Sequence, residues 1–101
     1  MRRCPSLCVL LLFVLSSAQV LAEPPLGREL YGRHCESCHG MDGRGLLPGT
    51  PDLSRPDAMM LPDSMLMQVI ENGSGTMPAY LGILKPEEMR AVINYMRTMI
   101  Q

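Results

Sequence analysis

Two cysteines and a histidine lie within five consecutive residues of this 101-residue chain. Cys35 and Cys38 are separated by two residues, and His39 follows Cys38 directly. Thiolates and imidazoles bind metal ions, and closely spaced thiols can also form a redox-active disulfide. The cluster therefore allows three kinds of site: a zinc site, a redox dithiol, or a point of covalent attachment for a larger group.

The first two kinds of site lack the context that they need. A structural zinc site has four ligands, usually in two pairs, but the only other histidine is His34, directly before Cys35. A redox Cys-x-x-Cys typically follows a strand and begins a helix, and the alternating pattern of a strand is absent here. Zinc and dithiol chemistry are both disfavoured.

The third kind of site is covalent haem attachment, for which Cys-x-x-Cys-His is the known signal. Each thiol adds to one vinyl group, and two intervening residues let both sulfurs reach neighbouring vinyls on one edge of the haem. The histidine that follows is then placed under the iron. Export and composition support this interpretation.

The N-terminus has the order of a secretory signal peptide, with basic, then apolar, then small residues. Two arginines precede an apolar run over residues 7–15, which is too short to span a bilayer because a span needs about 20 residues. We expect cleavage after Ala22, with Ala18 as the other candidate site. This division predicts a signal peptide over residues 1–22 and one domain over residues 23–101.

The predicted mature domain is small and poor in aromatic side chains. It keeps three tyrosines and no tryptophan, and it loses Phe13, Cys4 and Cys8 with the signal peptide. A core of this size is marginal on its own, so we expect the attached group to fill its centre. Seven basic residues against ten acidic ones give a net charge of −3, which argues against a nucleic-acid partner.

The elements that must position the motif are predicted to be helices. Apolar and small residues at a spacing of four predict a helix over residues 26–36, and similar periodicity predicts helices over residues 62–72 and 86–99. The remaining segments are glycine- and proline-rich loops over 40–51 and 73–84, with 54–61 irregular or a single helical turn. The fold class is all-α.

Two apolar stripes predict which helix faces are buried. In the middle helix the stripe is Leu66, Val69 and Ile70, supported by Met65. In the last helix the stripe consists of Met89, Val92, Ile93, Met96 and Ile100.

From Leu26 to its C-terminus the chain resembles the class I, monohaem cytochrome c family. Cys35, Cys38 and His39 match the haem-attachment motif of that family. The resemblance implies that the two cysteines form thioether bonds and that His39 is the proximal iron ligand. It also implies a cytochrome c fold, with three or more short helices wrapped around one covalently bound haem c.

The resemblance extends to the helices outside the motif. Gly27 and Tyr31 match a glycine and an aromatic residue on the family's N-terminal helix, and Tyr95 matches an aromatic residue on its C-terminal helix. The family packs these two helices across each other. A missing side chain at Gly27 would permit their close approach.

Met77 is the candidate for the second iron ligand. It lies in the stretch GSGTMPAY, after a helix stop and directly before Pro78, which favours an extended backbone at Met77. The stretch resembles the Met-Pro ligand loop of the family. Met59 and Met60 are the reserve candidates, and the other methionines are expected to fill the core.

A proline carbonyl is expected to orient the proximal histidine, since metal-bound histidines usually donate their second N–H to an oxygen. The family uses a proline followed two residues later by a leucine. Pro51 and Leu53 fit this pattern, with Pro48 as the rival proline, and Leu53 would then pack on the haem. His34 is expected to be a surface or helix-packing residue.

The resemblance implies a one-electron carrier, not an enzyme, with His/Met axial ligation and a periplasmic location. Its expected partners are redox proteins such as a dehydrogenase, oxidase or reductase, and it would meet a membrane only through a retained signal segment or a complex. The stretch HGMDGRG resembles small bacterial cytochromes and c-type subunits, whereas the family's lysine-rich docking face is missing because Lys85 is the only lysine. The alternative is a haem-binding subunit, or a gas- or peroxide-handling protein with a displaceable sixth ligand.

Overall fold

The computed structural model describes residues 26–101, which form five helices and no named strand. The all-α fold class is confirmed. The predicted signal peptide and its cleavage site lie outside the described residues. The helices are α1 (Gly27–His34), α2 (Glu36–His39), α3 (Pro56–Met59), α4 (Asp63–Asn72) and α5 (Pro86–Arg97).

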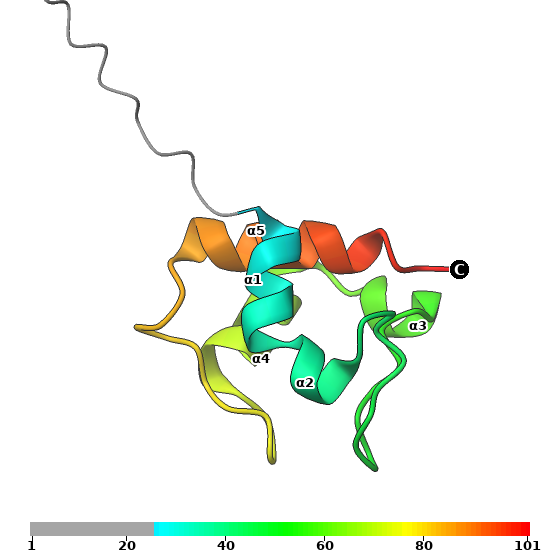
Figure 1. The fold of residues 1–101 in the computed structure, drawn as a ribbon. Helices are drawn as coiled ribbons and strands as arrows, with labels where there is room; N and C mark the ends of the chain where they lie inside the picture. Colours follow the sequence, from blue (N-terminus) through cyan, green and yellow to red (C-terminus); the bar gives the residue numbers. More distant parts are fainter. Residues whose placement is uncertain (1–25) are drawn as a thin grey trace, which may run out of the picture.

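The first predicted helix is divided in two by the first cysteine of the motif. α1 ends at His34, and Cys35 has φ −119° and ψ −35°, outside the helical range of φ. The backbone N–H of Cys35 still donates to the carbonyl of Tyr31 (2.8 Å), and the N–H of His39 donates to the carbonyl of Cys35 (2.9 Å). The motif therefore forms a helical turn of its own, α2, set at an angle to α1 (Figure 1).

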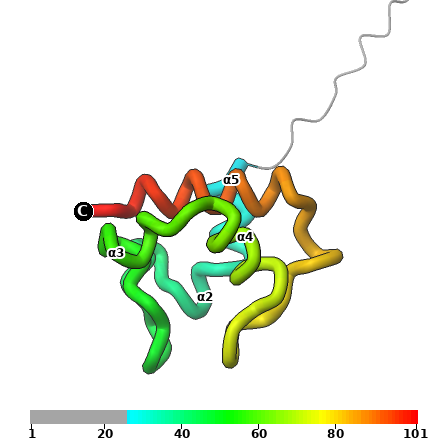
Figure 2. Tube along the Cα trace, turned by 180° about the vertical axis from the view of Figure 1, so that it is seen from behind, coloured from blue at the N-terminus to red at the C-terminus, as the bar shows by residue number. Residues whose placement is uncertain are grey.

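α1 and α5 cross each other on one side of the molecule, and α4 packs against α5 as well (Figures 1 and 2). A Cβ at Gly27 would collide with the backbone carbonyl of Ala91, so only glycine fits at the crossing. The rings of Tyr31 and Tyr95 meet edge to face, with their centroids 5.4 Å apart, an arrangement that aromatic pairs prefer. The predicted close approach of the first and last helices is confirmed.

The core lies between α1, α4 and α5. The predicted stripe of the last helix is buried at Met89, Val92, Ile93 and Met96, while Ile100 is partly exposed. The stripe of the middle helix was predicted too wide, because only Leu66 and Ile70 are buried. Met65 and Val69 are 49% and 42% exposed. Each precedes a buried residue by one position and is rotated by about 100° from the contact with α5.

Local contacts set the ends of the last helix. Pro86 occupies its first turn, and the backbone N–H of Lys85 donates to the carboxylate of Glu88 (2.8 Å). At the other end Arg97 forms an ion pair with Asp63 and donates to the carbonyl of Leu61 (3.1 Å). α5 is thereby joined to the segment that precedes α4. Among residues 26–101, no helix has the length and apolar character that a membrane crossing requires.

Two long loops project from the helices in the same direction, away from α5 (Figures 1 and 2). One follows the motif and covers residues 40–53, and the other covers residues 73–84, which include the tight turn between Ser74 and Met77. They are called the 40–53 loop and the 73–84 loop below. Each carries residues that the sequence assigns to the site.

Candidate metal centre

The turn α2 brings the three motif side chains together. Cys35, Cys38 and His39 occupy positions i, i+3 and i+4 of one helical turn, which share a face of the helix. All three side chains are partly buried. This explains why the spacing matters, because one more or one fewer intervening residue would place a thiol on another face.

The two thiols are free of each other and differ in environment. Neither is in a disulfide, and burial, followed by the nearby Cys38, raises the pKa of Cys35 to about 11. A redox-active dithiol instead has a thiolate stabilised by a lowered pKa. Cys35 therefore lacks the stabilised thiolate of a redox dithiol, in agreement with the sequence analysis.

His39 has the properties of a metal ligand. Burial lowers its pKa, and metal coordination requires the neutral imidazole. Its Nδ1 is buried and has no hydrogen-bond partner among the described residues, whereas nearly all buried polar atoms in proteins have one. A neutral ring with an unsatisfied nitrogen, beside two free thiols, fits a covalently attached haem.

The 40–53 loop is folded back onto the motif by backbone hydrogen bonds. Gly45 donates to the carbonyl of His39 (2.8 Å), Leu46 to that of Cys38 (2.9 Å), and Leu53 to that of Gly43 (2.8 Å). Leu53 is buried, at 9% exposed, as a residue packing at the site should be. The first part of the loop, up to Leu46, is therefore held against the motif.

The two candidate prolines of this loop, Pro48 and Pro51, are both exposed. Neither carbonyl accepts a hydrogen bond from Nδ1 of His39 in this structure. Pro51 lies two residues before the buried Leu53, and Pro48 lies nearer the tip of the loop. The choice of Pro51 over Pro48 stays a prediction.

Met77 is held in a tight turn against the end of α4. Ser74 and Met77 exchange backbone hydrogen bonds of 3.1 and 2.9 Å, and the side chain of Met77 is partly buried against the core. Gly73, at φ 71°, ends α4, and a Cβ there would lie 2.5 Å from the carbonyl oxygen of Met77. The glycine lets the loop return close to the helix end and so fixes the position of Met77.

The reserve methionines lie in different surroundings. Met59 is completely buried in the core cluster, and its neighbour Met60 is 75% exposed. Met59 packs as a core residue, and Met60 has the exposure of a surface residue. Met77 is the one of these three that is partly buried and lies in a loop.

Two tyrosine hydroxyls at the site were not recognised from the sequence. Tyr31 donates to the carbonyl of Gly40 (2.6 Å), directly after His39, and Tyr80 donates to the carbonyl of His34 (2.7 Å), directly before Cys35. His34 also packs its ring edge-on against Tyr80, which confirms its packing role. The only sequence signal for Tyr80 was its place three residues after Met77.

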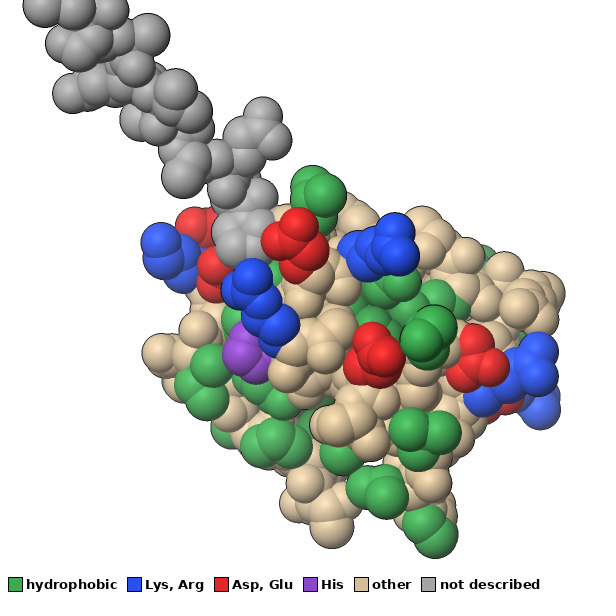
Figure 3. Space-filling model, viewed as in Figure 1, with side chains coloured by type: hydrophobic (Ala, Val, Ile, Leu, Met, Phe, Trp, Pro, Cys, Tyr) green, Lys and Arg blue, Asp and Glu red, His purple; other side chains and the backbone are tan. Residues whose placement is uncertain are grey.

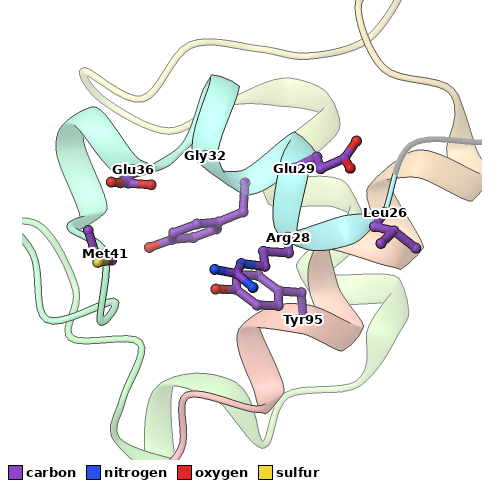
Figure 4. Close-up of a pocket in the computed structure, with 8 residues that line it drawn as sticks. Leu26, Arg28, Glu29, Gly32, Glu36, Met41 and Tyr95 are labelled. Carbon is purple, nitrogen blue, oxygen red and sulfur yellow. The ribbon is translucent and has the colours of Figure 1, made fainter.

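An open cavity of about 470 Å³ lies on the outer side of the helix crossing (Figure 4). Its lining includes Arg28 and Glu29 of α1, Leu26 directly before that helix, and Tyr95 of α5. None of the three motif side chains lines this cavity, and neither does Met77. The cavity is therefore separate from the candidate metal centre.

Comparisons with known proteins agree with the fold and the motif. Residues 22–96 match the family described as "Cytochrome C oxidase, cbb3-type, subunit III". Cytochrome c6 of Nostoc sp. (strain PCC 7120 / SAG 25.82 / UTEX 2576) is 32% identical over 87 residues, covering 82% of this chain and 77% of the relative. Cytochrome c6 of Euglena viridis is 33% identical over 73 residues, covering 68% of this chain and 84% of the relative.

A solved structure has the same fold. The c-type cytochrome KustC0563 superposes with a TM-score of 0.71 at 25% sequence identity, covering 76% of this chain and all of the other. A helical fold with a Cys-x-x-Cys-His turn at its centre defines a c-type cytochrome. The chain belongs to the class I, monohaem cytochrome c family. It is a one-electron carrier with one covalently bound haem c.

Proposed function

We propose that Cys35 and Cys38 are the thioether attachments of the haem and that His39 and Met77 are its two axial ligands. The observation that carries the proposal is the shared helical face of the motif, with a neutral, partly buried imidazole whose Nδ1 has no hydrogen-bond partner among residues 26–101. Met77 adds a partly buried thioether on a loop that is held against α4.

The bound group would supply a reversible one-electron iron couple, and Met/His ligation raises its reduction potential. With His39 and Met77 holding the group, no position would be left open for a substrate. The protein would then carry electrons and catalyse no reaction of its own. A gas- or peroxide-handling role would need a vacant or easily displaced ligand.

The second ring nitrogen of His39 requires an acceptor once the first binds the metal. We propose the carbonyl of Pro51, with Leu53 packed beside the haem. The acceptor would fix the plane of the imidazole and increase its basicity. It would also satisfy a nitrogen that is otherwise buried without a partner.

The partner is proposed to be a redox protein, such as a dehydrogenase, oxidase or reductase, that docks over the exposed haem edge. The 40–53 loop has no charged residue between Arg44 and Asp52, and the 73–84 loop has none at all. Figure 3 shows the same pattern, because charged side chains gather over the upper part and right edge of the face, and the lower part carries apolar and neutral groups. The docking face is therefore proposed to be uncharged, with the small contact area of transient redox encounters.

The location follows from the N-terminal sequence. We propose that residues 1–22 are a cleaved signal peptide and that residues 23–101 form the cytochrome domain in the periplasm. The redox partners would then be periplasmic proteins or the exposed domains of membrane complexes. N-terminal sequencing of the exported protein tests the cleavage site, and Glu23 is the expected first residue.

Absorption spectroscopy of the purified haem protein tests the axial ligands. The oxidised protein should show the weak far-red band of sulfur bound to ferric iron, and Met77→Ala should abolish it. Met60→Ala is the matched control, because it removes an exposed methionine and should leave the band unchanged. A wild-type protein that lacks the band and readily binds carbon monoxide would overturn the proposal.

A further inference from the structure

Tyr80 joins the 73–84 loop to the segment that carries the first cysteine. Its hydroxyl donates a hydrogen bond of 2.7 Å to the main-chain carbonyl of His34, 46 residues away in the sequence. Its side chain is only 8% exposed. The bond is thus part-buried and connects two segments that the chain itself does not keep close.

The rest of Tyr80 is fixed as well. Its backbone N–H donates to the carbonyl of Ile70 in α4 (2.9 Å), and its own carbonyl accepts from the N–H groups of Ile83 and Leu84 (2.9 and 3.0 Å). The ring lies edge-on to that of His34, with centroids 5.7 Å apart and planes at 76°. Tyr80 is thereby held between the last turn of α4 and the end of α1.

The acceptor at His34 is one that the helix itself leaves without a regular partner. His34 is the last residue of α1, and carbonyls in the last turn of a helix lose their intrahelical donors. Burial raises the pKa of Tyr80, so the hydroxyl keeps its proton and remains a donor at neutral pH. Without that donor, the part-buried carbonyl of His34 would have to bind water or remain without a hydrogen-bond partner.

Met77 lies between two fixed points of the backbone. On one side, Ser74 and Met77 exchange hydrogen bonds directly after Gly73 at the end of α4. On the other side, three residues further on, Tyr80 is bound to α4 through its backbone and to α1 through its hydroxyl. Of these contacts, the hydroxyl bond is the one that joins Met77's loop to the helix leading into Cys35.

We propose that Tyr80 is a positioning residue for the sixth iron ligand, because its bond to the His34 carbonyl holds the loop of Met77 against the haem-bearing turn. The proposal rests on the proposed ligation by His39 and Met77. Without this bond the loop moves away more often, and the population in which Met77 has left the iron increases. Tyr80 thus controls how easily another ligand replaces Met77.

Imidazole binding to the oxidised haem protein tests this role, since imidazole enters only where Met77 leaves. Tyr80→Phe keeps the ring and its packing and removes the hydroxyl alone. We expect the variant to bind imidazole about fivefold more tightly than wild type, as the loss of one hydrogen bond of ordinary net strength implies. The far-red band should persist without imidazole and disappear at lower imidazole concentration.

Two variants separate the specific effect from general destabilisation. Tyr31→Phe removes a similar hydroxyl–carbonyl bond of 2.6 Å, to Gly40 in the other loop, and His34→Ala removes the ring contact with Tyr80 but keeps the carbonyl. Both should bind imidazole within about twofold of wild type, because neither loses the bond that holds the loop. Tyr31→Phe should still lower the unfolding temperature.

The outcomes distinguish the two proposals. Unchanged imidazole affinity in Tyr80→Phe, or an equal gain in Tyr31→Phe, would overturn the positioning role while wild type still shows the far-red band. A wild-type protein without that band would instead overturn Met77 ligation itself. An increase confined to Tyr80→Phe supports the positioning role.

Discussion

The 40–53 loop and the 73–84 loop are each joined to the helices by a tyrosine hydroxyl, but over different sequence distances. Tyr31 reaches the carbonyl of Gly40, nine residues away, whereas Tyr80 reaches the carbonyl of His34, 46 residues away. The first loop also returns to the motif through two short backbone hydrogen bonds, from Gly45 to His39 and from Leu46 to Cys38. The second is bound at its two ends, to α4 and to α1.

This difference teaches how the two sides of the metal centre come to be ordered. The attachment side, with Cys35, Cys38 and His39, is built from neighbouring residues of one turn, so its geometry needs little of the remaining fold. The ligand side, with Met77 and its loop, is brought to the motif across a long segment of chain. The entropy cost of closing that segment must be overcome by contacts that form only in the complete fold. We therefore expect the attachment side to withstand perturbation and the ligand side to open first.

Removal of the attachment side should have the largest effect. In the double variant Cys35→Ala, Cys38→Ala no thiol is left among residues 23–101 for a covalent bond. We expect complete loss of haem staining on a denaturing gel, together with loss of a cooperative thermal transition, because a domain of this size is marginal without its cofactor. Circular dichroism on heating measures the second effect.

The serine between the two cysteines supplies the matched control for that experiment. Ser37 is exposed and lies on the same turn, so Ser37→Ala should keep both the covalent haem and the thermal transition. Haem that still withstands denaturation in the double variant would show that the attachment lies elsewhere in the chain.

The crossing of α1 and α5 holds the helix that leads into the attachment side. Two glycines in α1 test how closely the two helices approach each other. Gly27→Ala would drive a methyl group into the backbone of α5 at Ala91, and overpacking against a backbone that cannot give way should cost about 3 kcal/mol of unfolding free energy. Gly32→Ala adds its Cβ 3.5 Å from the Glu36 carboxylate and should stabilise the helix by about 0.5–1 kcal/mol. Urea unfolding of the two haem-bound variants measures these changes in unfolding free energy, which should have opposite signs.

Equal effects of the two substitutions would contradict the close approach of α1 and α5. The comparison is matched because both glycines are helical and lie on the same element. They differ in what an added Cβ would meet, which is the backbone of Ala91 at Gly27 and the carboxylate of Glu36 at Gly32.

Sequence reasoning succeeded where the determinants were local or matched a family pattern. The turn of Cys35 and His39, the proline start of α5 and the glycine at the crossing are all visible as short patterns. Sequence reasoning failed where residues distant in the chain determine which side chains are buried and which groups are hydrogen-bonded. Periodicity alone could not show that Val69 lies outside the contact with α5. Nor could it pair the Tyr80 hydroxyl with a carbonyl 46 residues away.

The ligand side can be weakened without touching a ligand. At Gly73 a Cβ would meet the carbonyl oxygen of Met77 at 2.5 Å and the backbone of the next two residues at 2.9 Å. Gly73→Ala should therefore displace Met77 and raise the affinity of oxidised protein for imidazole about tenfold, corresponding to overpacking of about 1.4 kcal/mol. The haem should stay covalently attached.

Gly75→Ala is the control for the backbone conformation alone. Gly75 also has positive φ (58°), but a Cβ there would meet no atom within 4 Å. The substitution places an alanine in the left-handed backbone conformation, which costs about 1 kcal/mol. It should change imidazole affinity by less than about threefold. A larger effect at Gly75 than at Gly73 would show that the loop is not positioned by its contact with α4.

The smallest expected effect concerns charge, which is absent from the 73–84 loop and from residues 45–51 of the 40–53 loop. If electrons leave over an uncharged face, the rate of oxidation by a small anion such as hexacyanoferrate should reflect the local charge and not the net charge of −3 predicted for the mature chain. Because added salt screens charges within about 10 Å at 0.1 M, we expect the rate to change less than about twofold between low and moderate salt. A cationic cobalt complex should give an equally flat response.

Thr76→Glu places one charge in the exposed, uncharged stretch of the 73–84 loop. That single carboxylate should slow oxidation by the anion at low salt, and the loss should disappear as salt is added, because screening removes the repulsion. A distant charge should have little effect, so Glu87→Gln in α5 is the control. If the wild-type rate rises steeply with salt and Glu87→Gln changes it as much as Thr76→Glu does, electrons do not leave through the face that the two loops form.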